Sequence, residues 1–250
     1  MMRYIINDYP FEKFDFLHYL KILFKDRGHR AIYQFLNRVH RRAFSRGLIE
    51  TYAPTGIGLE IGVGARTICP TERTVLSDAF SVHGVHDSIA KVFFHGGEIP
   101  YDDKSFSFIV SEHALEHIAN PLKVLKECIR VLKAGGKLFL FLPHMERTND
   151  SHRKVTTLEH LIDDYSKDVP PDDQTHVDDW FRNVVKKGLM PLHYSHLTKK
   201  DLLKTGSIHH HVWTEKQLIE IMDYLALKIC YVNAKVPDRR DSFVVVAEKK

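Results

Sequence analysis

Short apolar runs recur along the chain from residue 56 onward, separated by polar stretches and turn residues. Apolar runs bounded in this way predict β-strands. A run that is apolar throughout, such as LFLFL at 138–142, predicts a central strand that is covered on both faces. The expected strands are GIGLEIG (56–62), TVLSD (74–78), KVFFH (91–95), FSFIVSE (106–112), KLFLFLP (137–143), KICYVNAKV (228–236) and SFVVVAEK (242–249).

Two segments between these strands have helical periodicity. In NPLKVLKECIRVLKAGG (120–136), Asn120 can cap the helix, Pro121 suits its first turn, and Gly135 and Gly136 can end it. The second helix, TEKQLIEIMDYLAL (214–227), is expected to begin after Thr214 as its cap. Strands that alternate with helices predict an α/β fold, with a mostly parallel sheet and helices on both of its faces.

Residues 1–50 show no strand alternation, and we expect them to form a helical cap. A basic cluster near Gly47 has two interpretations: a solvated face at a helix C-terminus, or an anion-binding edge. The apolar residues at helical spacing are Ile32, Phe35, Leu36, Val39 and Phe44, and the basic ones are His40, Arg41, Arg42 and Arg46.

The alternation stops between residues 144 and 213, a stretch rich in histidine that also contains the acidic segment DDYSKDVPPDDQTHVDD (163–179). This insertion is too long for a simple connection, and it leaves the carboxyl edge of the sheet, where open α/β folds bind ligands. We therefore expect one domain over 1–250: a cap (1–50), a core (54–143 and 214–250), and a lid or acceptor wall (144–213).

Composition adds little to this picture. With 44% hydrophobic and 27% charged residues, the chain has an ordinary soluble composition, and its net charge of +4 gives only weak support for an anionic partner. Three scattered cysteines argue against a disulfide framework and against a cysteine-based zinc cluster. No membrane span or signal peptide is evident, and we expect a cytoplasmic protein.

The stretch TGIGLEIGVGART (55–67) places Gly62 and Gly64 in a turn directly after an apolar strand that contains Glu60. A dinucleotide site would need a third glycine where Thr67 stands, and Glu60 would repel a pyrophosphate. S-adenosylmethionine carries an ammonium group, a sulfonium and ribose hydroxyls but no phosphate. The turn therefore favours this methyl donor over NAD.

Three further motifs follow in register: Ile99–Ser107 (IPYDDKSFS), Leu115–His117 (LEH) and Arg130–Gly136 (RVLKAGG). Together with the glycine turn, they resemble the class I S-adenosylmethionine-dependent methyltransferases, and most closely the methyltransferase type 11 group, over residues 54–143. The resemblance implies a Rossmann-like, seven-stranded, mostly parallel sheet with S-adenosyl-L-methionine as the cofactor.

The same resemblance implies roles for individual residues near the strand ends. Those expected at the methionine and ribose part of the cofactor are Glu60, Gly62, Gly64 and Asp78, and those expected near the adenine are His95, Gly96 and Glu98. Ser111 and His113 are expected beside the transferable methyl group.

His113 and His117 are four residues apart, a spacing that would place both on one helical face. Ala114 stands where a metalloprotease motif requires glutamate, so that interpretation is not favoured. We expect His117 to cap or pack the turn. His113 is the candidate for positioning the acceptor or for accepting its proton, since the pKa of histidine suits that role.

The insertion resembles an extension of bacterial methyltransferases encoded among polysaccharide and lipopolysaccharide biosynthesis genes. This resemblance implies a sugar or glycan acceptor. By their chemistry, Arg153 is suited to bind a carboxylate or phosphate of an acidic sugar, and Trp213 offers a flat face to a sugar ring. The matching acceptor-side positions are His144, Asp150, Arg153, Thr156 or Thr157, His160, Asp164, His209, His211 and Trp213.

Histidines and aspartates together can also hold a divalent metal, which some sugar O-methyltransferases use to polarise the acceptor hydroxyl. None of the spacings is diagnostic of such a site. A polar, hydrogen-bonded pocket wall without a metal is therefore the expectation for this part of the chain.

From the sequence we expect methyl transfer from S-adenosylmethionine to an oxygen of a sugar or glycan intermediate, by a single in-line displacement. Transfer to another small metabolite or to a lipid-linked ring is an alternative within enzymes, and a non-catalytic cofactor-binding subunit is an alternative outside them. The acidic segment beside the expected acceptor site disfavours nucleic acid. The sequence leaves the oligomeric state open.

Overall fold

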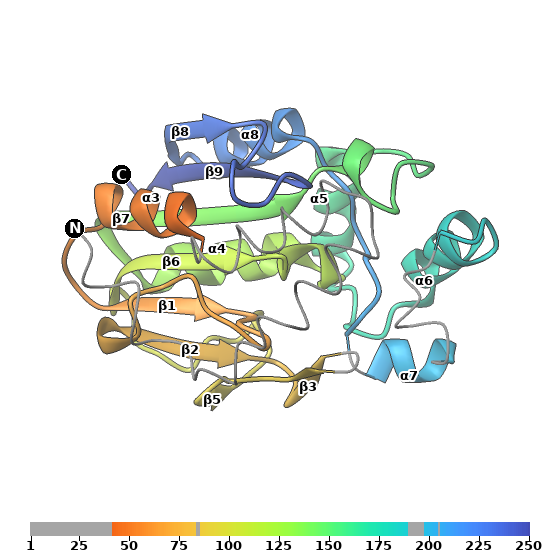
Figure 1. Cartoon of the computed structure of the whole chain (residues 1–250), viewed down its shortest axis with the longest axis horizontal. Coiled ribbons are helices and arrows are strands. Elements are labelled where there is room, and N and C mark those ends of the chain that lie inside the picture. Colours follow the sequence, from red (N-terminus) through yellow and green to blue (C-terminus); the bar gives the residue numbers. More distant parts are fainter. Residues whose placement is uncertain (1–41, 84–85, 190–197, 205) are drawn as a thin grey trace, which may run out of the picture.

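A computed structural model of the chain describes residues 42–83, 86–189, 198–204 and 206–250. Seven strands form one sheet in the order β5-β2-β1-β6-β7-β9-β8 (Figure 1). The strands are β1 (Gly58–Ile61), β2 (Thr74–Asp78), β5 (Val92–Phe93), β6 (Phe106–Glu112), β7 (Leu132–Pro143), β8 (Lys228–Asn233) and β9 (Ser242–Glu248).

Neighbouring strands from β5 to β7 pair in parallel, and β9 alone runs antiparallel, between β7 and β8. The order of the strands reverses at β1, which pairs with β2 on one side and with β6 on the other. Loops leave in opposite directions at such a switch point and open a crevice at the carboxyl ends of the strands. The predicted Rossmann-like, mostly parallel sheet is confirmed.

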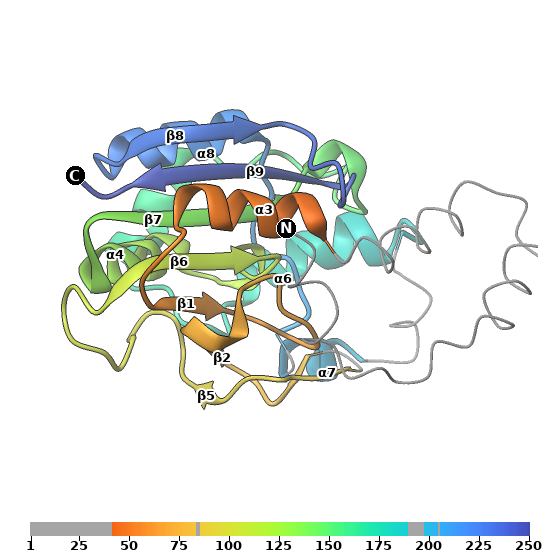
Figure 2. The ribbon, with the colours of Figure 1, turned by 60° about the vertical axis from the view of Figure 1, so that its left-hand side comes forward.

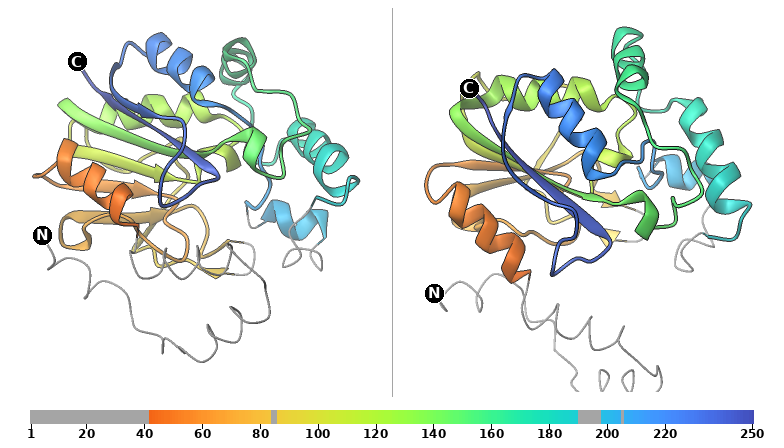
Figure 3. Two further views of the ribbon diagram at one scale, coloured as in Figure 1. Left: turned by 45° about the horizontal axis from the view of Figure 1, so that its top comes forward. Right: turned by 90° about the horizontal axis from the view of Figure 1, so that it is seen from above.

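Helices cover both faces of the sheet (Figures 2 and 3). Helix α3 (Ala43–Tyr52) packs on one face, where Leu48 and Ile49 join a buried cluster with Phe108 and Phe139. Helices α4 (Pro121–Val131), α5 (Leu158–Ser166) and α8 (Glu215–Tyr224) share the larger apolar cluster on the other face. Every central strand is therefore buried on both sides, as its continuous apolar sequence requires.

The two predicted helices begin where their caps are. The side chain of Asn120 accepts a hydrogen bond from Lys123 N, and Thr214 and Gln217 form a capping box. The end of α4 was predicted wrongly: it stops at Val131, and Gly135 and Gly136 lie within the first part of β7. Leu132 pairs with Phe106 of β6, so sheet pairing takes over before the glycines are reached.

Residues 1–41 lie outside the described residues. They hold most of the predicted cap and, from its basic cluster, His40 and Arg41. Arg42 and Arg46 are described, and the helix near them begins rather than ends: Gly47 is inside α3 and Arg42 is its N-cap. Arg42 is buried and forms an ion pair with Glu112, so the interpretation as a solvated face is wrong for this residue.

The insertion runs beyond the carboxyl ends of the strands (Figure 1). Its helices α6 (Gln174–Trp180) and α7 (Lys199–Lys204) lie there, and a π-helical turn (Phe181–Val185) follows α6. Val177, Trp180 and Val184 form a small apolar cluster with Ile208, separate from the two clusters of the sheet. The remaining short elements are β3 (Val82–His83), β4 (His86–Asp87) and 3-10 turns at Thr71–Arg73, Leu115–His117 and Met145–Arg147.

Within the ranges given above, none of the helices combines the length and the apolar character that a membrane crossing demands.

Candidate active site

The turn after β1 has glycine at two positions where the backbone takes a positive φ. Gly62 has φ +71°, and a Cβ placed on it would lie 2.3 Å from the Cβ of Ala114 in the loop after β6. Gly64 has φ +56°, and no described atom would lie within 4 Å of its Cβ. Gly62 therefore serves the close approach of two loops, whereas Gly64 borders open space where a ligand can approach the backbone.

Asp78, at the end of β2, holds this turn in place. Its carboxylate accepts hydrogen bonds from Gly64 N (3.0 Å), Ala79 N (2.8 Å) and the Ser88 hydroxyl (2.8 Å). A ribose hydroxyl would have to replace the Ser88 hydroxyl on this carboxylate. The cofactor role expected of Asp78 stays a prediction, and the structure adds a second role, that of organising the glycine turn.

Glu60 lies in β1, two residues before Gly62, and is only 1% exposed. Its carboxylate accepts a hydrogen bond from the Thr67 hydroxyl, which in turn accepts one from Cys69 N at 2.9 Å. Burial raises the pKa of Glu60 to about 7, against the lowering effect of these hydrogen bonds. Glu60 therefore connects the end of β1 to Thr67, at the far end of the glycine turn. Direct contact between Glu60 and a cofactor stays a prediction.

The residues expected near the adenine follow β5. Gly96 packs on α4, where an added Cβ would lie 3.0 Å from Val124, so packing explains this glycine. His95 meets Phe80, which follows β2, edge to face with ring centroids 5.8 Å apart. Gly206 of the insertion packs on the same Phe80 ring. The insertion thus reaches the end of the crevice where adenine is expected, and Glu98 is exposed nearby.

Ser111, Glu112 and His113 come at the end of β6, across the switch point from the glycine turn. Ser111 is buried between its sheet partners Ile61 and Leu140. Glu112 receives hydrogen bonds from Arg42 and, at 2.9 Å, from Arg239 in the β8–β9 loop. Burial alone would raise the pKa of Glu112, but the two guanidinium groups outweigh it and lower the pKa.

His113 is held at both ring nitrogens. Arg239 donates to Nδ1 at 2.9 Å, which leaves the proton on Nε2, and Nε2 lies 2.6 Å from the Ser242 hydroxyl. Burial, followed by the nearby Arg239 charge, lowers the pKa of His113 well below its usual value. This neutral, doubly bonded imidazole fits a positioning role. A role as general base, which stays a prediction, would require one of these two bonds to open.

The expected shared helical face of His113 and His117 is wrong. His113 has φ +52°, and the turn that follows is a single 3-10 turn from Leu115 to His117. His117 Nδ1 donates to the Ile208 carbonyl at 3.1 Å, and its ring packs edge to face on His209. His117 therefore joins the loop after β6 to the insertion.

Glu116 is a candidate that the sequence reasoning missed. It is fully buried, and neither carboxylate oxygen has a hydrogen-bond partner among the described residues. One oxygen lies 3.6 Å from His113 Nδ1 and 3.8 Å from His117 Nε2. Burial raises the pKa of Glu116 to about 7, although the His209 charge opposes the shift. The available signal was an acid between Leu115 and His117 in the Leu-Glu-His motif.

Arg153 does not face an acceptor. All three of its guanidinium nitrogens bind the protein: Nε donates to Asp179, one terminal nitrogen to Asp150 and the His209 carbonyl, and the other to the His210 carbonyl, all at 2.8–2.9 Å. The contact with an acidic sugar stays a prediction, and this arrangement does not favour it, because Arg153 is buried and four of its five N–H donors already bind the protein. Arg153 instead clamps the start of the insertion to its end.

Asp150 and His209 form a buried ion pair at 2.6 Å beside this clamp. Burial alone would raise the pKa of Asp150, but His209 and Arg153 lower it to about 2. Burial works against a charged His209 as well, yet its pairing with Asp150 raises its pKa above the usual value. Both residues are held by protein partners rather than by solvent.

Two more of the predicted acceptor contacts are structural. Trp213 is fully buried and stacks on His211 at a 19° interplanar angle, so its face is not available to a sugar ring and that prediction is wrong. Thr157 caps α5 by accepting a hydrogen bond from His160 N. His144 is also buried, with Nε2 at 3.4 Å from a carboxylate oxygen of Glu215. The structure does bring together His160, Asp164 and His211, and it adds His176 to them.

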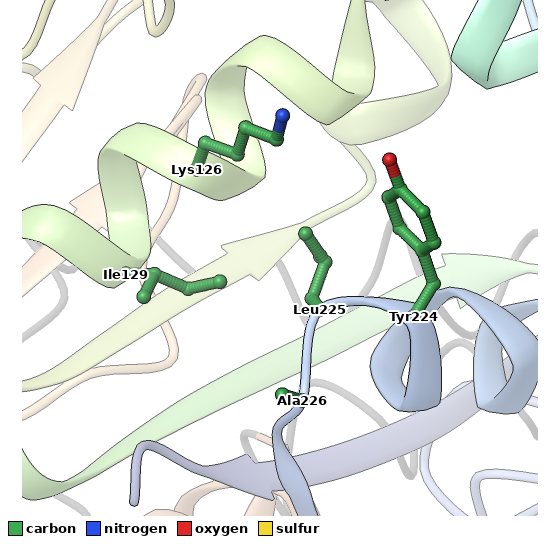
Figure 4. Close-up of a pocket in the computed structure, with 5 residues that line it drawn as sticks. All are labelled: Lys126, Ile129, Tyr224, Leu225 and Ala226. Atoms are coloured by element: carbon green, nitrogen blue, oxygen red, sulfur yellow. The ribbon is translucent and has the colours of Figure 1, made fainter.

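A shallow hollow on the helical face is a different feature. It is lined by Lys126 and Ile129 of α4 and by Tyr224, Leu225 and Ala226 at the end of α8 (Figure 4). These residues offer no paired acid and base and no donor set for a cofactor. The crevice at the carboxyl edge therefore remains the candidate site.

Comparison with known proteins agrees with this location. Residues 68–140 match a family model described as a methyltransferase domain. The cofactor implied by this domain and fold is S-adenosyl-L-methionine. The turn at Gly62 and Gly64 fits that ligand, because it leaves bare backbone beside open space and has acidic residues next to it.

The relatives match only in part. The chain is 32% identical over 96 residues to an uncharacterised protein of Methanocaldococcus jannaschii, a match that covers 37% of this chain and 47% of that protein. It is 32% identical over 99 residues to a sterol 4-C-methyltransferase of Caenorhabditis elegans, which covers 38% of this chain and 29% of that protein. The matches thus span less than half the length of these relatives.

Among solved structures, an S-adenosylmethionine-dependent methyltransferase of Methanosarcina mazei is 18% identical, with a TM-score of 0.49. The match covers 81% of this chain and 96% of that one.

The glycine turn can be tested with alanine at each position. We expect Gly62→Ala to lower the free energy of unfolding by about 2–4 kcal/mol, because its Cβ collides with Ala114 and its φ is positive. Gly64→Ala should lower the free energy of unfolding by only about 1–2 kcal/mol, because its φ is positive but its Cβ meets no described neighbour. Urea unfolding measures both values. Ala114→Gly added to Gly62→Ala should recover part of the loss; equal losses at 62 and 64 without any recovery would contradict the close approach.

The raised pKa of Glu60 predicts a pH-dependent loss of stability. The folded state binds this proton more tightly than the unfolded state, so the stabilisation is fully present below about pH 4.5 and is lost as the pH rises to about 7. From pH 5.5 to pH 8, Glu60→Gln should therefore gain about 2 kcal/mol of unfolding free energy relative to the unsubstituted chain.

Urea unfolding at the two pH values measures the Glu60 effect, and Glu72→Gln is the control at an exposed position. A difference between Glu60→Gln and the unsubstituted protein that does not change with pH would show that the buried carboxyl titrates normally.

Proposed function

We propose that this chain is an S-adenosylmethionine-dependent methyltransferase that methylates a hydroxyl oxygen of a small sugar or glycan intermediate. The observation that carries the proposal is the glycine turn at the switch point, where Gly64 borders open space, Asp78 accepts a hydrogen bond from Gly64 N, and Glu60 is buried in the preceding strand. This turn immediately precedes the stretch that matches a methyltransferase domain.

The turn suits a nucleoside without phosphates better than a dinucleotide. A pyrophosphate is normally held by the N-terminus of a helix that starts at the turn. Here residues 65–73 contain no α-helix, only the 3-10 turn Thr71–Arg73. The buried Thr67, which stands where a third glycine would be, is bonded to Glu60. These features support the methyl donor over NAD.

The acceptor side of the crevice supports a polar substrate. Glu116, His117 and His209 have their polar atoms close together after β6, and His113 lies 3.6 Å from Glu116, so a polar acceptor beside this group would meet polar partners. Bound S-adenosylmethionine supplies a methyl group that its sulfonium already activates, so the chain has to orient the acceptor, exclude water and take up one proton. Glu116, with a pKa of about 7 and no hydrogen bond on its carboxylate among the described residues, is the group suited to hold that proton.

Calorimetry and a transfer assay test the function. S-adenosylmethionine and its demethylated product should both bind, and NAD should not. Radioactive methyl should then pass to hydroxyl groups of sugars or nucleotide sugars. Binding of NAD alone would overturn the proposal. Donor binding without transfer to any acceptor would indicate a non-catalytic subunit, and transfer only to apolar rings would contradict the sugar acceptor.

The proton-accepting role of Glu116 predicts a specific pH profile. The carboxylate form is the competent one, so kcat should rise with pH through about 7 in the unsubstituted enzyme. Glu116→Gln cannot accept the proton, and we expect it to lower kcat about 100-fold or more and to remove this limb of the profile. Steady-state rates from pH 5.5 to 9 measure both effects.

The control for this test is Glu159→Gln, an exposed glutamate of α5. Affinity for the demethylated product should stay within about twofold in both variants, which shows an intact fold. An unchanged limb near pH 7 in Glu116→Gln would exclude Glu116 as the proton acceptor while leaving the methyltransferase proposal standing.

A further inference from the structure

Four side chains of the insertion aim their ligand atoms at one point. His160 and Asp164 come from α5, His176 from α6, and His211 from the segment before α8. Asp164 Oδ2 lies 3.3 Å from His160 Nε2, 3.4 Å from His176 Nε2 and 3.8 Å from His211 Nε2. The Nε2 atoms of His160 and His176 are 2.9 Å apart and share a hydrogen bond, which a metal ion bound to both nitrogens would replace.

These separations are those of ligands around a metal ion. Nitrogen and oxygen ligands bind Zn²⁺ at about 2.0–2.2 Å, so two ligands of a tetrahedral site are about 3.3–3.5 Å apart. The four distances scatter around this value, although the residues come from three separate segments of the chain.

The oxygen at the centre of the cluster lacks a hydrogen-bond partner. Asp164 is 5% exposed, and its Oδ2 accepts no hydrogen bond within the described part of the chain, even though two imidazole nitrogens lie within 3.4 Å. The nitrogens approach this oxygen without the alignment that a hydrogen bond needs. A buried carboxylate oxygen left in this way is costly, and a cation among the four atoms would remove the cost.

Groups outside the cluster orient its members. His176 Nδ1 lies 3.0 Å from Asp173 Oδ1 without the alignment of a hydrogen bond, and this carboxylate is placed to take the Nδ1 proton when Nε2 binds a metal. His160 and Asp164 are four residues apart on α5, which places them on one face of a helix capped by Thr157. The Asn120 side chain donates to the Asp164 carbonyl and ties this helix to α4.

His211 differs from the other three residues. Its Nε2 lies 3.0 Å from the Ala119 carbonyl, and one nitrogen cannot both donate a proton to that oxygen and bind a metal. His160, Asp164 and His176 are therefore the principal ligands. His211 joins them as the fourth ligand once its proton moves to Nδ1, which is buried without a hydrogen bond to any described residue.

We propose that His160, Asp164 and His176, with His211 as a fourth ligand, bind one Zn²⁺ or a similar first-row divalent ion. Imidazole ligands with one carboxylate favour such ions over Mg²⁺ or Ca²⁺, which prefer oxygen ligands alone. The side chain of His160 is 42% exposed and gives the ion a path from solvent.

The ion would tie the insertion to the carboxyl edge of the sheet. The backbone nitrogens of His210 and His211 both donate to the Glu116 carbonyl, so the metal-binding segment is attached directly to the loop after β6. One ion would connect α5, α6 and this segment, and would hold the insertion over the crevice. This role concerns binding and stability, and it does not depend on the proposed methyl transfer.

A metal titration of the untagged, full-length protein tests the site. After dialysis against a chelator, ZnCl₂ should bind with about one equivalent per chain and raise the unfolding temperature, and MgCl₂ should do neither. CoCl₂ should give the visible absorption of a tetrahedral ion. Less than about 0.2 equivalents of Zn²⁺ bound, with no thermal shift, would overturn the proposal.

Matched variants locate the ion. Asp164→Asn and His176→Ala should each weaken Zn²⁺ binding about 100-fold or more, and His211→Ala should weaken it less. The neighbouring Asp163→Asn and the exposed His152→Ala should leave it unchanged. Circular dichroism and affinity for the demethylated cofactor show whether each variant folds.

Undiminished Zn²⁺ binding in the double variant Asp164→Asn, His176→Ala would overturn this site. In that outcome, loss of binding in His117→Ala would place the ion at the second group of potential ligands, Glu116, His117 and His209.

Discussion

The candidate site depends on how closely the loops after β1 and β6 approach each other. At Gly62 the space that a Cβ would need is taken by Ala114. The backbone after β1 therefore packs directly on the small side chain of Ala114 in the loop after β6. Because the strand order reverses between these strands, the same contact forms the floor of the crevice. Asp78 then fixes Gly64 beside open space. A bare backbone surface for a ligand follows from these contacts among three neighbouring strands.

Two glutamates with buried side chains, Glu112 at the end of β6 and Glu116 in the loop that follows, differ in what their carboxylates contact. Glu112 is satisfied by Arg42 and Arg239, which come from the segment before α3 and from the β8–β9 loop, so its charge holds distant parts of the chain together. Glu116 has no such partner in the described structure, and its pKa is raised to about 7. A carboxyl group left in that state beside imidazoles is suited to proton transfer.

The histidines of the insertion have a different role from the one that their composition implied. Arg153, Asp150 and His209 are occupied with one another, and Trp213 is fully buried. They form an internal scaffold that holds the insertion closed on itself and on the sheet. The proposed metal site extends this scaffold, because its ligands lie on α5, on α6 and next to the residues that Arg153 binds. The acceptor would then meet the few polar groups that this scaffold positions at the crevice.

The sequence by itself determined the strands, the starts of both predicted helices and the glycine turn, because apolar periodicity, capping residues and positive φ are local properties. It could not place Arg42 or Arg239 on Glu112, since these residues are far from Glu112 in the chain. Nor could it place His176 beside Asp164, since that contact depends on how the consecutive helices α5 and α6 pack. For the same reason it assigned Arg153 and Trp213 to an acceptor. Residue type shows what a side chain can bind, but only tertiary packing decides whether its donors are already used by the protein or remain for a ligand.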